Sequence, residues 1–565
     1  MNAVVEVGMT LNYVVDSTCT KYRDLYAIGM AMEEPITYGV FHKQILALAL
    51  KLQKEGIRKG DHIAILSENS QNWGIAYLAI VRIGAIAVPI LPDLPESDVH
   101  HILNEMQVKA LFITQKQIEK IYELRNELEG IIITLDDYTA DISIVSVITF
   151  ATFLAEAITA YDENAEDPVF PMVGENDLAS ILYTSGTSGY SKAVMLSHKN
   201  LTANAYAAAD LMDIPSGSVW LSILPMSHTY EFTCGFMLPL LCGGRIAYAG
   251  KTPTPAILQK LCAYEKPFAI FAVPLVLEKI YKKRVMPQIE KSAVLKMMCK
   301  IGVSRKLIYR KIGKNLLKFF GGNLKLMGIG GAALNPEVEK FLNEAKFPYL
   351  IGYGMTESSP LIAGGPSGDT TIAIGSAGKP ISGMEIKIID PDPSRGIGEI
   401  SICGPSVMLG YYDDKESTDA VLTHDGWLLT GDLGRMDKRG NLHVCGRSKN
   451  VIVMPSGENV YPEAIEHKLN TYSWIVESLV VDNNGQLEAW VYPDYEFIDD
   501  ETSGVSRAER RQYMEDLMEN MRAELNQRLS KSSRVTKVFE RREPFIKTAT
   551  HKIKRYLYSG HAMLG

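Results

Sequence analysis

Apolar and polar positions alternate with two different periods along the first part of the chain. Residues 41–57, FHKQILALALKLQKEGI, carry apolar side chains at the three- and four-residue spacing of an amphipathic helix. Short apolar runs typical of buried strands follow at HIAILS (62–67), AIAVPIL (85–91) and ALFIT (110–114). Helices that alternate with buried strands predict a largely parallel sheet whose two faces are covered by helices.

The same rhythm returns between Ser180 and Leu350 and predicts a second, related α/β lobe. Its strand candidates are SILYT (180–184), VWLSIL (219–224), RIAYAG (245–250), FAIFAV (268–273), LKLMGIG (324–330) and FPYLIG (347–352). After Gly375 the pattern changes to short runs broken by glycine, MEIKIID, GEISICG and LHVCGR, which indicate a β-rich subdomain at about 375–448.

A last segment mixes strands with one long helix. SLVVD and EAWVY are the strand candidates, and Ser506 with Glu509 forms the capping box of a helix. The apolar residues of this helix follow one stripe and are expected to face a core: Met514, Leu517, Met518, Met521, Leu525 and Leu529. The fold class is therefore α/β, with a large N-terminal domain (1–448) and a small α+β C-terminal domain (449–565).

Composition narrows the class of protein. The chain has 565 residues, which predicts at least two domains, and its 46% hydrophobic and 22% charged residues are ordinary for a globular protein. The net charge of -8 gives no reason to expect nucleic-acid binding. No signal peptide or membrane span is predicted, and the seven scattered cysteines form no CxxC pair, so we expect a cytoplasmic protein.

The segment YTSGTSGYSKAVMLSH, residues 183–198, is the strongest candidate for chemistry. Small residues expose backbone N–H groups to phosphate oxygens, several hydroxyls add donors, and Lys192 adds a positive charge. The spacing is not that of a P-loop, because Ser191 stands where the second glycine would be and Ala193 follows the lysine. A plain glycine- and serine-rich surface loop is the alternative.

This segment resembles the phosphate-binding signature of the adenylate-forming superfamily, which includes acyl-CoA synthetases, luciferases and adenylation domains of peptide synthetases. The family usually has Thr, Pro and Gly where this chain has Ser188, Ser191 and Ala193. The resemblance implies that ATP is bound by Thr184, Ser185, Gly186, Thr187, Ser188, Gly189 and Lys192.

Two further motifs resemble the adenine-binding wall and the catalytic centre of the same family. MGIGGAA (327–333) contributes Gly331 and Ala332, and YGMTESSP (353–360) contributes Tyr353 and Gly354. Tyr353 offers a stacking face for a purine, and the Thr356 hydroxyl can contact an α-phosphate. By the resemblance Thr356 and Glu357 are catalytic, and Glu357 and Thr184 bind Mg²⁺, a cation that takes few protein oxygens beside nucleotide phosphates.

The remaining motifs complete the family order. His228, in LPMSHTYEF, is expected beside the acyl substrate, Asp432, in GWLLTGDL, at the ribose, and Arg447 at the ribose and phosphate. Lys449 falls at the family's hinge and Gly457 beside its CoA channel. In PFIKTATHKIKR, Lys552 matches the catalytic lysine, while Ile546 and His551 replace the family's usual proline and glycine.

The resemblance, which extends from about Tyr38 to Tyr558, is to long-chain fatty acyl-CoA synthetases. It implies that a fatty acid, ATP and CoA react with Mg²⁺ as cofactor: an acyl adenylate forms first, and the small domain then turns about Lys449 to admit CoA. A ligase that loads an acyl carrier protein and a non-catalytic acyl- or nucleotide-binding homologue remain alternatives. The absence of a Walker loop and of kinase signatures disfavours a simple ATPase or kinase.

One observation stands apart from the family. The range Lys279–Lys318 holds thirteen Lys or Arg residues and Glu290 as its single acid, interleaved with apolar residues. Such a basic amphipathic segment can lie on anionic lipid, and we expect a peripheral contact with the inner face of the membrane. A solvated helix face, or cations that attract CoA phosphates, is the alternative. A homodimer is left open.

Overall fold

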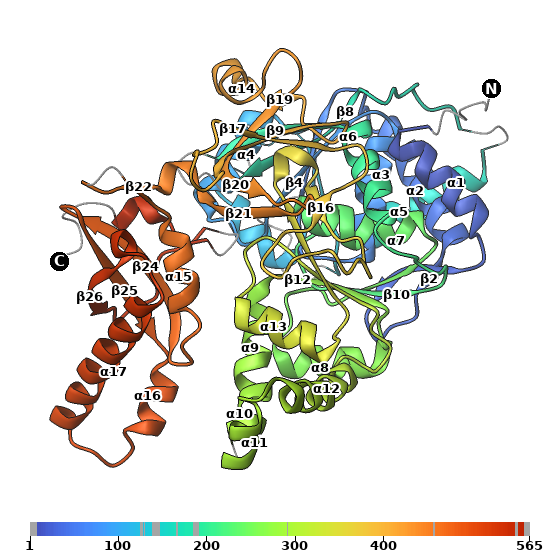
Figure 1. The fold of residues 1–565 in the computed structure, drawn as a ribbon. Coiled ribbons are helices and arrows are strands. Elements are labelled where there is room, and N and C mark those ends of the chain that lie inside the picture. The colour runs from blue at the N-terminus through green and yellow to red at the C-terminus, as the bar shows by residue number, and fades with distance from the viewer. Residues whose placement is uncertain are drawn as a thin grey trace, which may run out of the picture.

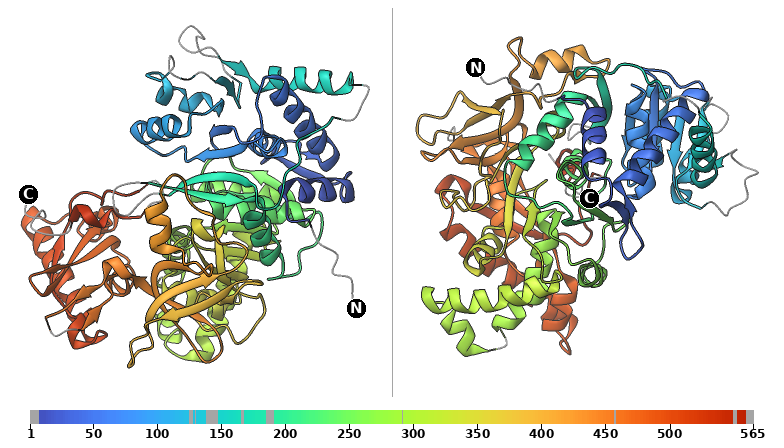
Figure 2. Two further views of the ribbon diagram at one scale, coloured as in Figure 1. Left: turned by 90° about the horizontal axis from the view of Figure 1, so that it is seen from above. Right: turned by 90° about the vertical axis from the view of Figure 1, so that its right-hand side faces the viewer.

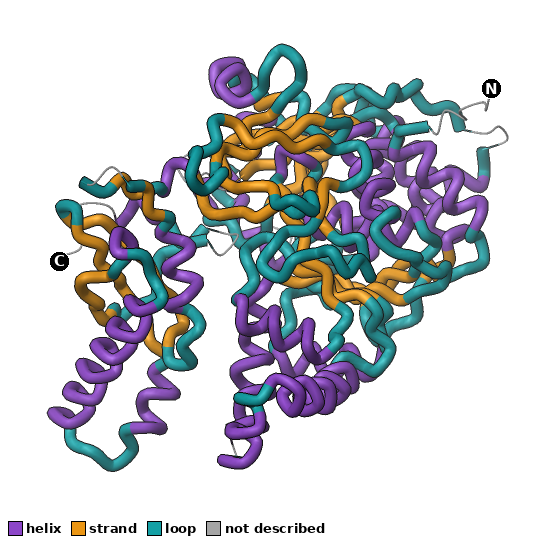
Figure 3. The backbone as a smooth tube through the Cα atoms, viewed as in Figure 1, coloured by secondary structure: helices purple, strands orange, loops and turns teal. Residues whose placement is uncertain are grey.

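The computed structural model describes residues 8–124, 128, 130–137, 147–164, 168–184, 191–290, 292–455, 458–548 and 552–558. Two large sheets dominate it, and helices cover both (Figures 1 and 3). The strands of the nine-stranded sheet, in spatial order, are β16 (Lys379–Pro380), β15 (Leu361–Gly364), β14 (Tyr349–Gly354), β13 (Leu326–Ile329), β12 (Ala269–Ala272), β10 (Val219–Ser222), β11 (Arg245–Tyr248), β1 (Tyr26–Met30) and β2 (Ile36–Thr37). Its central strands, from β14 to β1, are all parallel.

The second sheet has eight strands. In spatial order they are β19 (Gly410–Tyr411), β9 (Lys192–Ser197), β8 (Leu178–Thr184), β4 (Ile86–Ile90), β3 (His62–Leu66), β5 (Ala110–Ile113), β6 (Ile131–Thr134) and β7 (Ile148–Thr149). The β4 run is buried at every position, as expected for a parallel strand covered on both faces. The predicted α/β class and helix-covered sheets are confirmed.

The two lobes are not consecutive pieces of the chain. The SILYT run, expected in the second lobe, forms β8 and pairs with β4 of the earlier strands. In exchange, β1 and β2 come from the N-terminus and extend the later sheet. Assignment of SILYT to the second lobe was therefore wrong, because periodicity identifies a strand but does not determine its neighbour.

The covering helices follow the sequence pattern closely. The amphipathic run at 41–57 lies in α2 (Tyr38–Lys54) and its C-terminal turn. The others up to residue 345 are α1 (Leu11–Lys21), α3 (Gln71–Arg82), α4 (Glu96–Met106), η1 (Gln115–Ile121), α5 (Phe150–Asp162), α6 (His198–Ala209), η2 (Glu231–Met237), α7 (Leu238–Leu241), α8 (Pro255–Glu265), α9 (Pro274–Ile280), η3 (Tyr281–Val285), α10 (Met286–Glu290), α11 (Ala293–Met298), α12 (Gly302–Phe319) and α13 (Pro336–Ala345).

The glycine-broken segment forms the predicted β-rich part. It is a four-stranded antiparallel sheet in the order β17 (Glu385–Ile389), β18 (Gly398–Cys403), β20 (Leu428–Met436) and β21 (Leu442–Arg447). The short η4 (Thr356–Ser358) precedes it, and α14 (Lys415–Val421) lies between its strands in the sequence.

The elements after η5 (Ser448–Asn450), from β22 to η7, are called the C-terminal unit below. They lie to one side of the main body, at the left of Figure 1, and Figure 2 shows the same separation from above. They are β22 (Ile452–Val453), β23 (Asn459–Val460), α15 (Pro462–Leu469), β24 (Ile475–Asn483), β25 (Gln486–Pro493), α16 (Tyr495–Glu501), α17 (Arg507–Gln527), η6 (Lys531–Ser533), β26 (Val535–Glu540) and η7 (Arg555–Tyr558).

The C-terminal unit has hydrophobic clusters of its own. Its long helix α17 begins after Ser506, and the capping box with Glu509 is present as predicted. Met514, Met521 and Leu525 of that helix are buried against the three-stranded sheet β24–β25–β26. The predicted apolar stripe therefore faces a core.

Candidate functional site

A connected polar group lies where β14 meets the four-stranded sheet. The Tyr353 hydroxyl donates a hydrogen bond to Asp432 Oδ2 at 2.7 Å, and Asp432 Oδ1 lies 3.2 Å from Arg447 Nε. Asp432 and Arg447 are paired across β20 and β21, so strand register holds them together. Burial, with the nearby Asp432 carboxylate, raises the pKa of Tyr353 well above its ordinary value, so this hydroxyl stays a donor.

A second chain of contacts joins the end of the β8–β9 hairpin to Glu357. Thr184 and Lys192 are paired at that end, and the Thr184 hydroxyl donates to the Lys192 carbonyl at 3.3 Å. The Lys192 ammonium lies 4.5 Å from the centre of the Tyr411 ring, and the Tyr411 hydroxyl donates to Glu357 Oε1 at 3.0 Å. The hairpin therefore presents its lysine toward the same side as Glu357.

Glu357 has the properties of a carboxylate that could hold Mg²⁺. One of its oxygens is oriented by Tyr411, and within the described part of the chain the other accepts no hydrogen bond. A single oriented carboxylate suits Mg²⁺, which binds one or two protein oxygens and takes the rest from phosphates and water. Thr356 precedes it in η4, and both residues are partly exposed.

Glycines allow close backbone approach around this group. Gly331 has φ of +82°, in the left-handed region, at the exposed turn that also contains Ala332. A Cβ on Gly330 would lie 3.0 Å from the Tyr230 ring, and one on Gly354 would lie 2.1 Å from the Pro360 carbonyl oxygen. Gly354 is thus required by the packing of β14 on β15.

His228 lies in the turn just before η2. Its Nδ1 accepts a hydrogen bond from the Tyr230 backbone N–H at 3.1 Å, so we infer the tautomer with the proton on Nε2. Burial, and then the positive charge of Lys552, lower the pKa of His228 to about 4. The ring is therefore a neutral donor at physiological pH.

Lys552 comes from the C-terminal unit and reaches the same place. It directly precedes Ile553, which forms an isolated β-bridge with Lys547. The Thr548 N–H donates to the Lys552 carbonyl at 2.8 Å, and the Lys552 N–H donates to the Thr548 hydroxyl at 3.2 Å. The residue as a whole stays partly exposed, while the protein around its ammonium displaces bulk water. Removal from bulk water, and then Arg447, lower the pKa of Lys552, while the carboxylates of Asp432 and Glu357 act in the opposite direction.

The charge of Lys552 acts on the pKa of His228, and three other charged groups act on the pKa of Lys552. Five predicted residues are therefore close enough for their charges to interact: His228, Glu357, Asp432, Arg447 and Lys552. The departure at Ile546 does not prevent this placement, since its N–H donates to the Tyr558 hydroxyl at 2.8 Å and its side chain is exposed. Lys449 is exposed in η5, which connects the four-stranded sheet to the C-terminal unit. The other predicted residues lie outside the described residues: Ser185, Gly186, Thr187, Ser188, Gly189 and Gly457, together with the departure His551.

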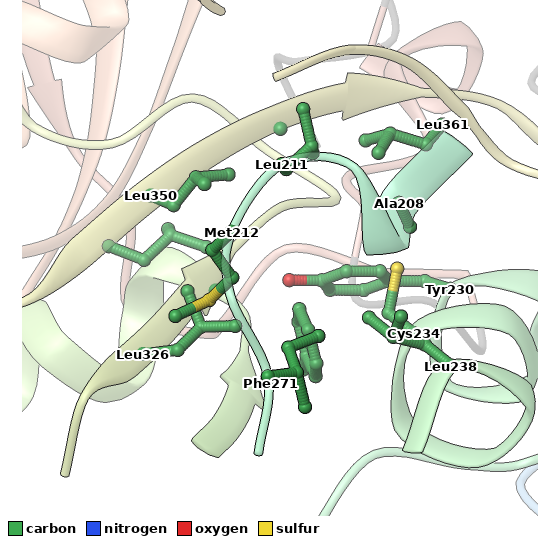
Figure 4. Close-up of a pocket in the computed structure, with 14 residues that line it drawn as sticks. Ala208, Leu211, Met212, Tyr230, Cys234, Leu238, Phe271, Leu326, Leu350 and Leu361 are labelled. Atoms are coloured by element: carbon green, nitrogen blue, oxygen red, sulfur yellow. The ribbon is translucent and has the colours of Figure 1, made fainter. Parts of the chain in front are cut away.

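An apolar cavity is lined by Tyr230, two residues after His228 in the sequence (Figure 4). Its empty space is about 440 Å³, including the part open to solvent, and none of its lining residues is charged. Tyr230, the residue just before η2, enters it, and the strands β13 and β14 form part of the wall. The lining is Ala208, Leu211, Met212, Ile214, Tyr230, Cys234, Leu238, Phe271, Leu326, Gly328, Ile329, Leu350, Gly352 and Leu361.

Sequence reasoning missed Tyr411 and the cavity lining. Tyr411 stands on β19, which pairs with β9 across more than two hundred residues of chain. Nothing in the local sequence around Tyr411 signals that pairing. The lining residues also come from many separate elements, so only the fold assembles them.

A family model described as AMP-binding enzyme matches residues 15–412. The chain belongs to the AMP-binding enzyme family. Among curated relatives of this AMP-binding enzyme, long chain acyl-CoA synthetase 6 of Arabidopsis thaliana is 29% identical over 76% of this chain and 64% of its own length. The medium-chain fatty-acid–CoA ligase of Escherichia coli is 28% identical over 79% of this chain and 73% of its own.

Other relatives act on different acids. A CoA ligase of Rhodococcus jostii named for an octahydroindenyl propanoyl group is 28% identical over 79% of this chain and 81% of its own. Among solved structures, the anthranilate CoA ligase AuaEII has a TM-score of 0.79 at 18% identity, with 98% and 97% of the two chains covered. MatB from Rhodopseudomonas palustris has a TM-score of 0.74 at 23% identity, with 96% and 97% covered. These structures establish the fold of the AMP-binding enzyme.

Proposed function

We propose that this AMP-binding enzyme is an acid–thiol ligase that activates a carboxylic acid with ATP and transfers the acyl group to CoA. The observation that carries the proposal is the convergence of Lys552, His228, Glu357 and the Asp432–Arg447 pair from separate elements, beside an apolar cavity. Curated relatives of similar sequence are named as CoA ligases, which supports the same reaction class.

In the first half-reaction a carboxylate oxygen of the acid attacks the α-phosphorus of ATP. The bond from that phosphorus to the bridging oxygen breaks, and pyrophosphate leaves with the acyl adenylate remaining. The Lys552 ammonium would neutralise charge on the carboxylate and the α-phosphate, and the Lys192 ammonium would face the departing phosphates. Mg²⁺, held by Glu357 and assisted by Thr184, would supply further charge neutralisation to the phosphates.

The surrounding residues orient the reactants. Asp432, with Arg447 and Tyr353 fixing its carboxylate, can accept hydrogen bonds from ribose hydroxyls. The neutral His228 can donate its Nε2–H to the carboxylate of the acid without competing for the proton, because its pKa lies near 4. The Thr356 hydroxyl is proposed to contact the α-phosphate.

In the second half-reaction the CoA thiolate attacks the acyl carbon, the carbon–oxygen bond to the phosphate breaks, and AMP leaves. A lysine that stabilises adenylation would obstruct this approach, so we propose that residues 449–565 turn as a body about Lys449 and withdraw Lys552. Gly457 is proposed to border the path of CoA.

We further propose that the acid is a fatty acid, with a long chain preferred. The uncharged cavity favours an apolar tail, and each buried methylene contributes about 0.8 kcal/mol, so kcat/KM should rise about four-fold per methylene until the cavity is filled. An aromatic or alicyclic acid is the second candidate, favoured by the relatives named for such acids. A carrier protein in place of CoA, and a binding protein without catalysis, are the remaining alternatives.

Mass spectrometry of products from MgATP, CoA and a panel of fatty and aromatic acids tests the proposal. We expect acyl-CoA with a preference for long fatty acids, and the variant Met212→Trp, which fills the cavity, should shift that preference to shorter acids. The matched control is Met172→Trp, at a position 91% exposed. Turnover of aromatic acids alone would refute the fatty acid, accumulation of adenylate without thioester would refute CoA as acceptor, and absence of both products would refute the reaction.

A further inference from the structure

The helices α11 and α12 form a surface that the rest of the chain leaves uncovered. Together with α10 they reach the lower end of the molecule in the view of Figure 1. The helix α11 contains no buried residue, although half of it consists of Val294, Leu295 and Met297. In α12 the buried hydrophobic residues Ile312, Leu316 and Phe319 belong to its second half, and its first half contributes only the partly buried Ile308 and Tyr309 to the core.

Large apolar side chains gather where the two helices meet. Val294, Met297, Ile301, Val303 and Leu307 are each between 61% and 75% exposed, and Met298 is 37% exposed. Single exposed apolar residues are common, but a contiguous group of this size on a soluble surface marks a contact with a partner or a lipid.

Basic residues lie next to this apolar group along the exposed side of α12. The exposed positions of α12 follow a helical spacing of three and four residues, so they form one stripe. Besides Gly302, Val303, Leu307 and Asn315, this stripe consists of basic residues: Lys306, Arg310, Lys311, Lys314 and Lys318. Lys296 and Lys300 are exposed beside it. No acidic residue occurs between Glu290 and Glu337.

Three of the basic residues that precede α11 contact other parts of the protein. Lys282 Nζ donates to the Ile475 carbonyl of the C-terminal unit at 3.0 Å, and Lys283 Nζ lies 3.9 Å from a Glu496 carboxylate oxygen. Arg284 lies over the Phe319 ring at 4.5 Å. The described basic residues of the range Lys279–Lys318 therefore do not form one surface: part of them contacts the C-terminal unit or packs on α12, and the second part faces solvent without such contacts to the C-terminal unit.

The combination of apolar and basic side chains identifies the partner. Free nucleotide or CoA phosphates would account for lysines but not for five exposed apolar residues among them. An anionic bilayer accounts for both, because apolar side chains enter the acyl boundary while lysines meet the lipid phosphates. None of the helices in the described part of the chain is long and apolar enough to cross a bilayer, so this contact would be peripheral.

We propose that the α11–α12 surface, defined by the apolar group Val294–Leu307 and the basic stripe Lys306–Lys318, docks the protein on an anionic phospholipid membrane. The surface lies on helices that supply none of the residues assigned to the reaction. Its docking is therefore independent of the proposed function and can be measured without turnover.

Flotation of the full-length protein with vesicles tests the proposal. The vesicles are phosphatidylcholine alone and phosphatidylcholine mixed with phosphatidylglycerol, and binding is expected to the mixed vesicles only. The triple variant Lys306→Glu, Arg310→Glu, Lys311→Glu should weaken this binding by about 100-fold or more. The matched control is Lys415→Glu, Lys438→Glu, Arg439→Glu, which makes the same charge change at exposed positions elsewhere and should bind nearly as the parent.

A second variant separates insertion from charge attraction alone. Met297→Gln, Ile301→Gln, Leu307→Gln keeps all charges and should weaken vesicle binding by about ten-fold or more, since three apolar side chains no longer enter the bilayer. Turnover of a water-soluble short acid should be unchanged in both surface variants, which also shows that they fold.

Three outcomes overturn the proposal. One is vesicle binding that neither variant reduces. Another is a concentration-dependent dimer that the glutamine variant abolishes, which would make a second copy of this chain the occupant. The third is loss of acyl transfer to an acidic carrier protein with vesicle binding retained, which would make that protein the partner.

Discussion

The two sides of the candidate site are built differently. Tyr353, Asp432 and Arg447 lie on strands and hold one another through their side chains. Lys552 faces them from a hairpin of the C-terminal unit, and its described hydrogen bonds are made by its backbone to Thr548. A side chain that is positioned by its backbone alone can leave together with the segment that carries it, whereas the strand-borne group stays in place.

Within the described residues, the hydrogen bonds that join the two bodies are made by polar side chains. Lys282 Nζ donates to backbone carbonyls of Tyr472 at 3.4 Å and Ile475 at 3.0 Å, and Asn450 donates to Glu463 at 2.5 Å. The C-terminal unit keeps its own hydrophobic clusters, so such contacts can break without exposing a core. The comparison teaches that the strand-borne group Tyr353, Asp432 and Arg447 is preorganised, whereas Lys552 and the unit that carries it are exchangeable.

The largest effect is expected from Lys552→Ala. Adenylation, measured by pyrophosphate exchange into ATP, should fall about 100- to 1,000-fold because charge at the α-phosphate loses its partner. Thioester formation from supplied acyl adenylate should change little, since Lys552 is withdrawn in that step. The control is Lys554→Ala in the same hairpin, and equal loss of both half-reactions would contradict an exchangeable lysine.

A smaller effect is expected on the preorganised side. Asp432→Asn keeps the shape but removes the charge that faces Arg447, so the KM for ATP should rise about 10- to 100-fold with a smaller change in kcat. Steady-state kinetics with ATP as the varied substrate measures this. A fall in kcat with an unchanged KM would show that Asp432 does not act in nucleotide binding.

The interface itself should show a still smaller and selective effect. Lys282→Met removes the hydrogen bonds to the C-terminal unit and should slow adenylation about ten-fold while leaving the thioester step unchanged or faster. Lys283→Met is the matched control, because its ammonium is exposed beside Glu496 and should contribute less than about two-fold. Equal slowing of both half-reactions would show that the Lys282 contact is not specific to the position that the C-terminal unit takes during adenylation.

The last effect is on stability rather than activity, and it concerns how acid acts on the large body that carries Tyr353, Asp432 and Arg447. Burial lowers the pKa of His198, at the start of α6, to about 4. Because the unfolded state binds this proton more tightly, stability is complete above about pH 6.5 and declines toward pH 4, by about 2 kcal/mol at pH 5. Thermal unfolding at pH 7 and 5 should show a loss that His198→Gln reduces and the exposed control His424→Gln does not; an equal loss in all three would remove His198 as the cause.

Much of the fold could be predicted from the sequence, because the spacing of apolar residues that distinguishes helices from strands is visible within short segments. The runs at HIAILS, AIAVPIL and LKLMGIG became β3, β4 and β13, and the capping box at Ser506 begins α17. Sheet membership could not be predicted in the same way. SILYT paired with the early strands because its neighbours are chosen by packing across the whole sheet, which period-two alternation does not encode.

For the site, sequence motifs supplied residues but not their contacts. Lys552 and His228 are more than three hundred positions apart, and only the docked C-terminal unit lets the charge of one act on the other. Tyr411 had no motif, and it became a link between Lys192 and Glu357 through the pairing of β19 with β9. The basic range Lys279–Lys318 was divided by the fold into a part that contacts the C-terminal unit and a part that faces solvent.

The sequence by itself determined the α/β class, the order of the motifs and the identity of the polar residues, since these depend on local period and on chemical type. The tertiary structure alone decided which strands share a sheet, which side chains meet in the site, the cavity lined by Tyr230, and which lysines remain free for a surface. These properties depend on packing between distant segments, and the free energy of that packing is set by the folded surfaces as a whole.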